Sequence, residues 1–128
     1  MPAVALIAII DDDESACAAI MGLVRSLGFN TVGFHSAAEF LHSDEVLRTA
    51  CVIADVQMPG MSGLELHRQL VATGSSIPTI LVTAYPDETT RRLALQAGVT
   101  SYLAKPVRPE NLLNCIREAL APSGEQPS

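Results

Sequence analysis

Short apolar runs alternate with amphipathic segments along the chain. Residues 5–10 are apolar without interruption, which is typical of a strand buried on both faces of a parallel sheet. Residues 15–27 instead repeat apolar side chains at helical spacing, which predicts an amphipathic helix. The same alternation continues to residue 120. We therefore expect strands at 5–10, 31–34, 51–54, 79–82 and 101–104, and helices at 15–27, from 36, 62–73, 87–97 and 109–120.

Residues suited to helix ends support these boundaries. Ser36 and Ser62 each precede a glutamate by three residues, which is the capping-box pattern of a helix start. Asp87 suits an N-cap, and Pro109 suits the first helical turn. A glycine directly follows three of the predicted helices, as is common at helix C-termini.

Five strand–helix units in 128 residues predict one doubly wound α/β domain, with a parallel sheet and helices on both faces. We place this domain at residues 1–120. Residues 121–128 carry Pro, Ser, Gly and Gln without periodicity, so we interpret them as a tail or the start of a linker.

Composition excludes several classes of function. The net charge is -6 and only eight Lys and Arg are present, whereas a nucleic-acid-binding domain usually needs a basic face. No run is long enough to cross a bilayer, and residues 4–10 lack the flanking features of a signal peptide. Cys17, Cys51 and Cys115 are far apart and odd in number, which favours reduced, buried thiols in a cytoplasmic protein.

Polar residues follow four of the predicted strands. Asp11, Asp12 and Asp13 follow the first strand, and Asp55 ends the third, just before a Pro/Gly turn. Elsewhere the chain has Thr83 and Lys105 in the equivalent positions, after the fourth and fifth strands. Open parallel sheets build their sites at the carboxyl ends of their strands, so we expect these groups to meet at one edge.

The three carboxylates Asp11, Asp12 and Asp55 would repel one another at that edge. Either a proton shared between two carboxylates or a bound divalent cation would relieve this electrostatic repulsion. A cluster of hard oxygen ligands with room for water suits Mg²⁺, and the main-chain carbonyl of Gln57 could add one more oxygen.

Lys105 and Thr83 would support an anion beside this cluster. The ammonium can pair with a phosphate or with Asp55, and the hydroxyl can donate one hydrogen bond. A carboxylate beside Mg²⁺, a lysine and a hydroxyl is what phosphoryl transfer to an aspartate requires. Ala84 is small and would leave a path for a donor.

The chain resembles the receiver (phosphoacceptor) domain of bacterial two-component response regulators. The resemblance covers residues 4 to about 120, and residues 34–41 are most similar to the nitrogen-fixation and nodulation regulators. It implies a flavodoxin-like strand order 2-1-3-4-5. The fragments that carry it are Ile10-Asp11-Asp12-Asp13, Asp55 with Met58-Pro59-Gly60-Met61-Ser62-Gly63, Thr83-Ala84, Tyr102 and Lys105-Pro106.

The resemblance implies a role for each residue. Asp55 would accept a phosphoryl group from a sensor histidine kinase, and Lys105 would contact Asp55 or that group. The residues implied to hold Mg²⁺, with Mn²⁺ as a substitute, are Asp12, Asp55 and the Gln57 carbonyl, with Asp11 acting mainly through a metal-bound water.

The resemblance also implies how the switch works. Thr83 would move toward the phosphoryl group, and Tyr102 would swing into the vacated space. The readout face would be the fourth helix, last strand and last helix. The Lys105-Pro106 bond would be cis. A phosphorylation-dependent homodimer and a DNA-binding effector domain beyond this chain are both compatible with it.

Other polar residues have plainer explanations. Asp13 and Glu14 suit the first turn of a helix. The three histidines, His35, His42 and His67, show no ligand spacing, so we interpret them as surface or hydrogen-bonded structural residues. The Arg91-Arg92 pair fits either a solvated helix face or a partner surface.

Two other functions are compatible with parts of the sequence. Asp11-x-Asp13 after a strand superficially matches phosphohydrolases with an aspartyl nucleophile, although that reading leaves Asp55 unexplained. A flavin-binding module could use the same sheet order, but an acidic crevice repels a phosphate unless a metal intervenes.

Overall fold

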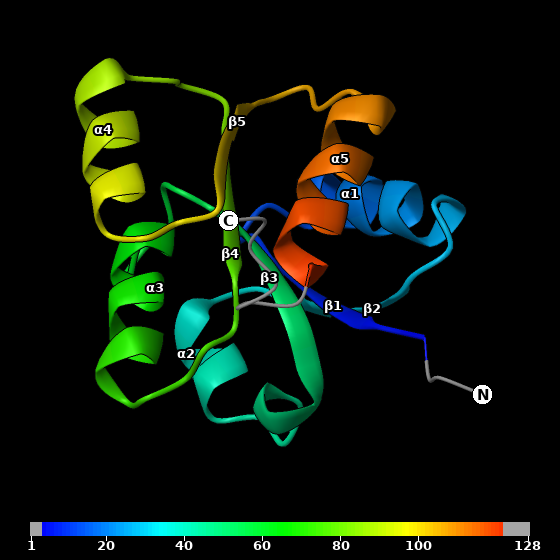
Figure 1. The fold of residues 1–128 in the computed structure, drawn as a ribbon, viewed down its shortest axis with the longest axis horizontal. Helices are drawn as coiled ribbons and strands as arrows, with labels where there is room; N and C mark the ends of the chain where they lie inside the picture. The colour runs from blue at the N-terminus through cyan, green and yellow to red at the C-terminus, as the bar shows by residue number, and fades with distance from the viewer. Residues whose placement is uncertain (1–3, 122–128) are drawn as a thin grey trace, which may run out of the picture.

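The computed structural model describes residues 4–121, and each strand in it is followed by a helix (Figure 1). The elements are β1 (Leu6–Ile10), α1 (Glu14–Ser26), β2 (Asn30–Phe34), α2 (Ala37–Leu41), the 3₁₀ helix η1 (Val46–Arg48), β3 (Thr49–Asp55), α3 (Gly63–Ala72), β4 (Thr79–Thr83), α4 (Glu88–Gln96), β5 (Ser101–Ala104) and α5 (Pro109–Leu120). The predicted strands and helices are all present.

The five strands form one sheet in the order β2-β1-β3-β4-β5, and every neighbouring pair is parallel. This confirms the predicted fold class and strand order. All carboxyl ends therefore lie at the same edge of the sheet. Asp55 pairs in register with Val82, and Thr83 pairs with Ala104, so these ends are level with one another.

Helices cover both faces of the sheet, with α1 and α5 on one side and α2, α3 and α4 on the other (Figure 1). The alternation of side chains in β1 shows why both faces must be apolar. Ile7 and Ile9 pack toward α1 and α5, whereas Ala8 and Ile10 pack toward the opposite layer. Burial on both sides explains the unbroken apolar run that predicted this strand.

Local capping fixes the helix starts close to the predicted residues. Ser62 and Glu65 form a complete capping box at α3, and Asp87 caps α4. At α2, Ser36 accepts from the Glu39 N–H as predicted, but Glu39 accepts from the N–H of His35. The glutamate therefore reaches one residue further back than a standard capping box, and the helix still begins where expected.

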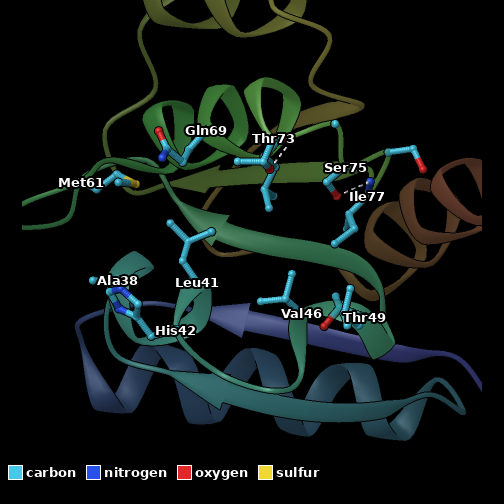
Figure 2. Close-up of a pocket in the computed structure, with 14 residues that line it drawn as sticks. Ala38, Leu41, His42, Val46, Thr49, Met61, Gln69, Thr73, Ser75 and Ile77 are labelled. Carbon is cyan, nitrogen blue, oxygen red and sulfur yellow. Dashed lines mark hydrogen bonds between the residues drawn. The ribbon is translucent and has the colours of Figure 1, made fainter.

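Two local features differ from prediction. β3 begins at Thr49, two residues before the expected start, and residues 46–48 form the 3₁₀ turn η1 just before it. The short α2 and η1 leave a cavity of about 860 Å³ between them and α3, lined in part by Leu41, Val46, Met61 and Ile77 (Figure 2). None of the candidate site residues lines this cavity.

Three further predictions concern the absence of a membrane-spanning segment, the state of the cysteines and the C-terminal tail. Within residues 4–121, no helix is long and apolar enough to cross a membrane. All three cysteines are free thiols; Cys17 and Cys51 are buried, and burial raises the pKa of Cys51 to about 12. Cys115 is only partly buried. Of the predicted tail 121–128, only Ala121 lies within the described residues.

Candidate phosphoacceptor site

Asp55 is the last residue of β3. The backbone of the next residue, Val56, is fixed by two hydrogen bonds. The N–H of Val56 donates to the Val82 carbonyl of β4 at 2.9 Å. The carbonyl of Val56 accepts from the N–H of Gly63 at 3.1 Å, which closes the turn that connects β3 to α3. The side chain of Asp55 is therefore presented at the sheet edge by a backbone with little freedom.

Three carboxylates converge there, as the sequence predicted. Asp11, Asp12 and Asp55 each place an oxygen within 4.8 Å of the others. Asp11 is 1% exposed and Asp55 9% exposed, whereas Asp12 is exposed. The cluster thus has a buried floor and an open side.

Lys105 lies against this cluster and binds Asp11 more closely than Asp55. Its Nζ is 2.8 Å from Oδ2 of Asp11 and 3.6 Å from Oδ1 of Asp55. The backbone N–H of Lys105 donates to the Thr83 carbonyl at 2.8 Å, and the Lys105-Pro106 bond is cis, as the resemblance implied. The pairing with Asp11 was not predicted, because sequence spacing gives no distance between the ends of β1 and β5.

The charges at the site shift two pKa values. Burial raises the pKa of Asp55, and Lys105 opposes this shift while the charges of Asp11 and Asp12 add to it. Burial alone would lower the pKa of Lys105, but its hydrogen bond to Asp11 and the two nearby carboxylates raise it. Lys105 therefore stays protonated, and it lies beside the carboxyl group of Asp55, whose ionisation is disfavoured by burial.

The oxygen cluster fits a Mg²⁺ ion. Opposite ligands of an octahedral ion with bonds near 2.1 Å stand about 4.2 Å apart. Carboxylate oxygens within 4.8 Å of one another can reach that spacing with small side-chain movements. The resemblance to receiver domains likewise implies Mg²⁺ at this acidic pocket. Both oxygens of Asp11 are already engaged, by the Asp13 N–H and by Lys105, so Asp12 and Asp55 are the freer ligands.

Thr83 and Tyr102 occupy the positions expected of a strand-end hydroxyl and a nearby aromatic ring. Thr83 is buried, and its Oγ1 accepts from the Tyr85 N–H at 3.0 Å, which leaves its own proton free to donate elsewhere. The Tyr102 hydroxyl accepts from the N–H of Asp87, the N-cap of α4, at 3.1 Å. Gln57 is exposed in the turn after Asp55.

The plainer predictions hold for the other polar residues. Asp13 is the N-cap of α1 and accepts from two backbone N–H groups. His35 and His42 are exposed, and His67 is buried with both ring nitrogens hydrogen-bonded. Arg91 pairs with Glu88 on the exposed side of α4. Capping of α1 therefore explains Asp13 without the phosphohydrolase interpretation of Asp11-x-Asp13.

Comparison with known proteins agrees with this geometry. The family described as the response regulator receiver domain matches residues 7–117. The response regulator protein TmoT of Ectopseudomonas mendocina is 40% identical over 94% of this chain, and Nodulation protein W of Bradyrhizobium diazoefficiens is 34% identical over 88% of it. The crystal structure of FixJ-N superposes with a TM-score of 0.84 at 28% identity, covering 94% of this chain and 95% of that one.

These matches confirm the predicted resemblance, including the nitrogen-fixation and nodulation subgroup. They give no support to the phosphohydrolase alternative. The chain spans about half the length of the curated relatives, 55% of TmoT and 49% of Nodulation protein W.

Proposed function

Because this chain belongs to the receiver domain family of response regulators, we propose that Asp55 is its phosphoryl acceptor. A single observation supports this choice most strongly. Asp55 is the carboxylate that ends the central strand β3 and has both Lys105 and two further carboxylates within reach. Asp11 is tied to Lys105 at 2.8 Å and to the Asp13 N–H, so it is the less available nucleophile.

The proposed reaction is attack by an Asp55 oxygen on the phosphorus of a kinase phosphohistidine. The Asp–O–P bond forms, the P–N bond breaks, and the electron pair returns to the histidine ring. Lys105 offsets the negative charge on the oxygens of the transferred group. The domain catalyses only its own phosphorylation and slow dephosphorylation, and it turns over no separate substrate.

Mg²⁺ would be held by Asp12, Asp55 and the Gln57 carbonyl, with Asp11 acting through a metal-bound water. When bound, this ion, or Mn²⁺ in its place, supplies additional positive charge beside the phosphoryl oxygens. Asp11 stays engaged with Lys105 and thereby keeps the ammonium beside Asp55.

The switch would act through Thr83 and Tyr102. Thr83 would turn its hydroxyl toward the phosphorylated Asp55, and Tyr102 would leave the backbone of Asp87 and move inward. Since Asp87 caps α4, this movement would release the start of that helix. The altered surface would be α4, β5 and α5, consistent with a two-state switch.

Incubation with acetyl phosphate and Mg²⁺, followed by intact mass measurement, tests this assignment. We expect one added phosphoryl group on the wild type. We expect none on Asp55→Asn or in the presence of EDTA. An adduct that persists in Asp55→Asn would show that another residue is the acceptor.

The proposal extends to the whole protein. Longer relatives bear names such as Transcriptional regulatory protein FixJ, of which this chain covers 60%, so we propose that residues 1–120 are a receiver whose output is an effector domain, with 121–128 leading toward it. This chain would act in the cytoplasm with a sensor histidine kinase as its phosphoryl donor, and phosphorylation would promote a homodimer through α4, β5 and α5.

A further inference from the structure

Gly63, the first residue of α3, lies directly against the carbonyl of Asp55. It is buried, and its N–H donates to Val56 at 3.1 Å. A Cβ at this position would stand 3.2 Å from the carbonyl carbon of Asp55 and 2.8 Å from Cδ2 of Leu81. It would approach the carbonyl oxygen of Asp55 more closely still, inside the 3.0 Å limit that real Cβ atoms observe.

The contact with Asp55 cannot be relieved cheaply, because the atom involved is backbone. Asp55 lies opposite Val82 of β4 in the sheet. The backbone of the next residue, Val56, is hydrogen-bonded both to β4 and to Gly63. A methyl group would be about 1 Å short of ordinary van der Waals contact, so either α3 or the end of β3 would have to shift. Backbone conformation is not the reason for glycine here, since its φ lies outside the left-handed region.

We propose that Gly63 is a positioning residue for phosphoryl transfer, which lets α3 start against the Asp55 carbonyl and so fixes the acceptor carboxylate relative to Lys105 and the metal ligands. This inference rests on the proposed role of Asp55. A displacement near 1 Å at a reacting group can lower a rate about 10²-fold, whereas the helix itself would favour alanine over glycine. A loss of rate in Gly63→Ala would therefore come from the contact and not from helix propensity.

The test compares Gly63→Ala with Gly22→Ala, since a Cβ at Gly22 in α1 would meet nothing within 4 Å. Folding is checked by circular dichroism and thermal melting, and phosphorylation by acetyl phosphate is timed by intact mass at saturating Mg²⁺. We expect Gly63→Ala to be folded and phosphorylated about 10- to 100-fold more slowly than the wild type. Gly22→Ala should react at the wild-type rate.

A second variant separates the two contacts of the added methyl. In Gly63→Ala/Leu81→Val the Cδ2 of Leu81 is gone, so only the clash with Asp55 remains. We expect this double variant to melt at a higher temperature than Gly63→Ala yet to remain slow in phosphorylation.

Wild-type rates in Gly63→Ala, or an equal loss in Gly22→Ala, would overturn the inference. So would failure of both Gly63 variants to fold, because Gly63 would then be a folding residue only. If the wild type itself is not phosphorylated on Asp55, it is the proposed function that fails.

Discussion

The ionised Asp55 side chain destabilises the domain that presents it. Burial raises its pKa, as do the charges of Asp11 and Asp12, and Lys105 offsets only part of this effect. The pKa of Asp55 is higher in the folded state than in the unfolded state. Ionised Asp55 therefore lowers the free energy of unfolding by its full amount at every pH above the folded-state pKa. The penalty disappears as the pH falls below the unfolded value, where both states are protonated.

We therefore predict that Asp55→Asn stabilises the metal-free domain at pH 7. The amide keeps the shape of the side chain and removes its charge, while Lys105 retains Asp11 at 2.8 Å. We expect a gain on the order of 1 kcal/mol, or about 4 °C in melting temperature for a domain of this size. Thermal melts in EDTA measure it, and the gain should shrink as the pH is lowered toward about 4.

Asp44→Asn is the matched control, because Asp44 is exposed and its replacement makes the same change in net charge. It should melt like the wild type. A destabilised Asp55→Asn at pH 7 would mean that Lys105 more than offsets the cost of burying this carboxylate.

Sequence alone identified the charged members of the site but not their pairing. Asp11, Asp55 and Lys105 were found because each follows an apolar run, and parallel strands must bring such residues to one edge. That Lys105 prefers Asp11 depends on side-chain geometry between β1 and β5. The role inferred for Gly63 likewise needs the distance between α3 and β3, which no local pattern contains.

At the scale of elements, α4 is a helix with little apolar anchorage. Ala94 is its only buried residue. Its C-terminal end is instead tied by His67 of α3, whose Nε2 lies 3.0 Å from the Ala97 carbonyl and whose Nδ1 lies 2.9 Å from Oγ1 of Thr79. A carbonyl can only accept, so Nε2 carries the proton and, in the neutral ring, Nδ1 accepts from the threonine hydroxyl.

We predict that His67→Leu lowers the free energy of unfolding by about 1–3 kcal/mol, since it leaves the Thr79 hydroxyl and the Ala97 carbonyl without their partner. Urea unfolding measures this loss. Amide exchange should accelerate most where α4 ends, at residues 97–99. His42→Leu is the control, because His42 is exposed and its loss should change neither quantity.

An unchanged unfolding midpoint in His67→Leu would show that packing of the leucine compensates for both lost hydrogen bonds. Faster exchange spread evenly over the domain would contradict a local role for His67 at α4.

The sequence pattern predicted those elements whose position depends on neighbouring residues in the chain. Strand β1 was recognisable from its apolar run and α3 from its capping box, and both are confirmed. The early start of β3 and the turn η1 were not predicted, because neither has apolar periodicity of its own. The function of His67 as a tie between α3 and α4 was equally invisible, since its partners are 12 and 30 residues away in sequence.

At the scale of the whole molecule, the acidic cluster links folding to metal binding. The chain carries a net charge of -6, and three of its carboxylates meet within 4.8 Å with one lysine beside them. Without a cation, the ionised Asp55 in this cluster opposes folding, because its pKa is raised in the folded domain. An ion that binds only the folded state adds stability by mass action, about 1.4 kcal/mol at a concentration ten times its Kd.

We predict from this that Mg²⁺ reverses the order of stability between the wild type and Asp55→Asn. In EDTA the variant should melt higher, because its cluster carries one charge less. As Mg²⁺ is raised at constant ionic strength, the wild-type melting temperature should climb while that of Asp55→Asn, deprived of a carboxylate ligand, should climb less. Parallel titration curves for the two proteins would show that Asp55 does not contribute to the metal site, whereas curves that converge and cross would show that one carboxylate both weakens the empty domain and holds its ion.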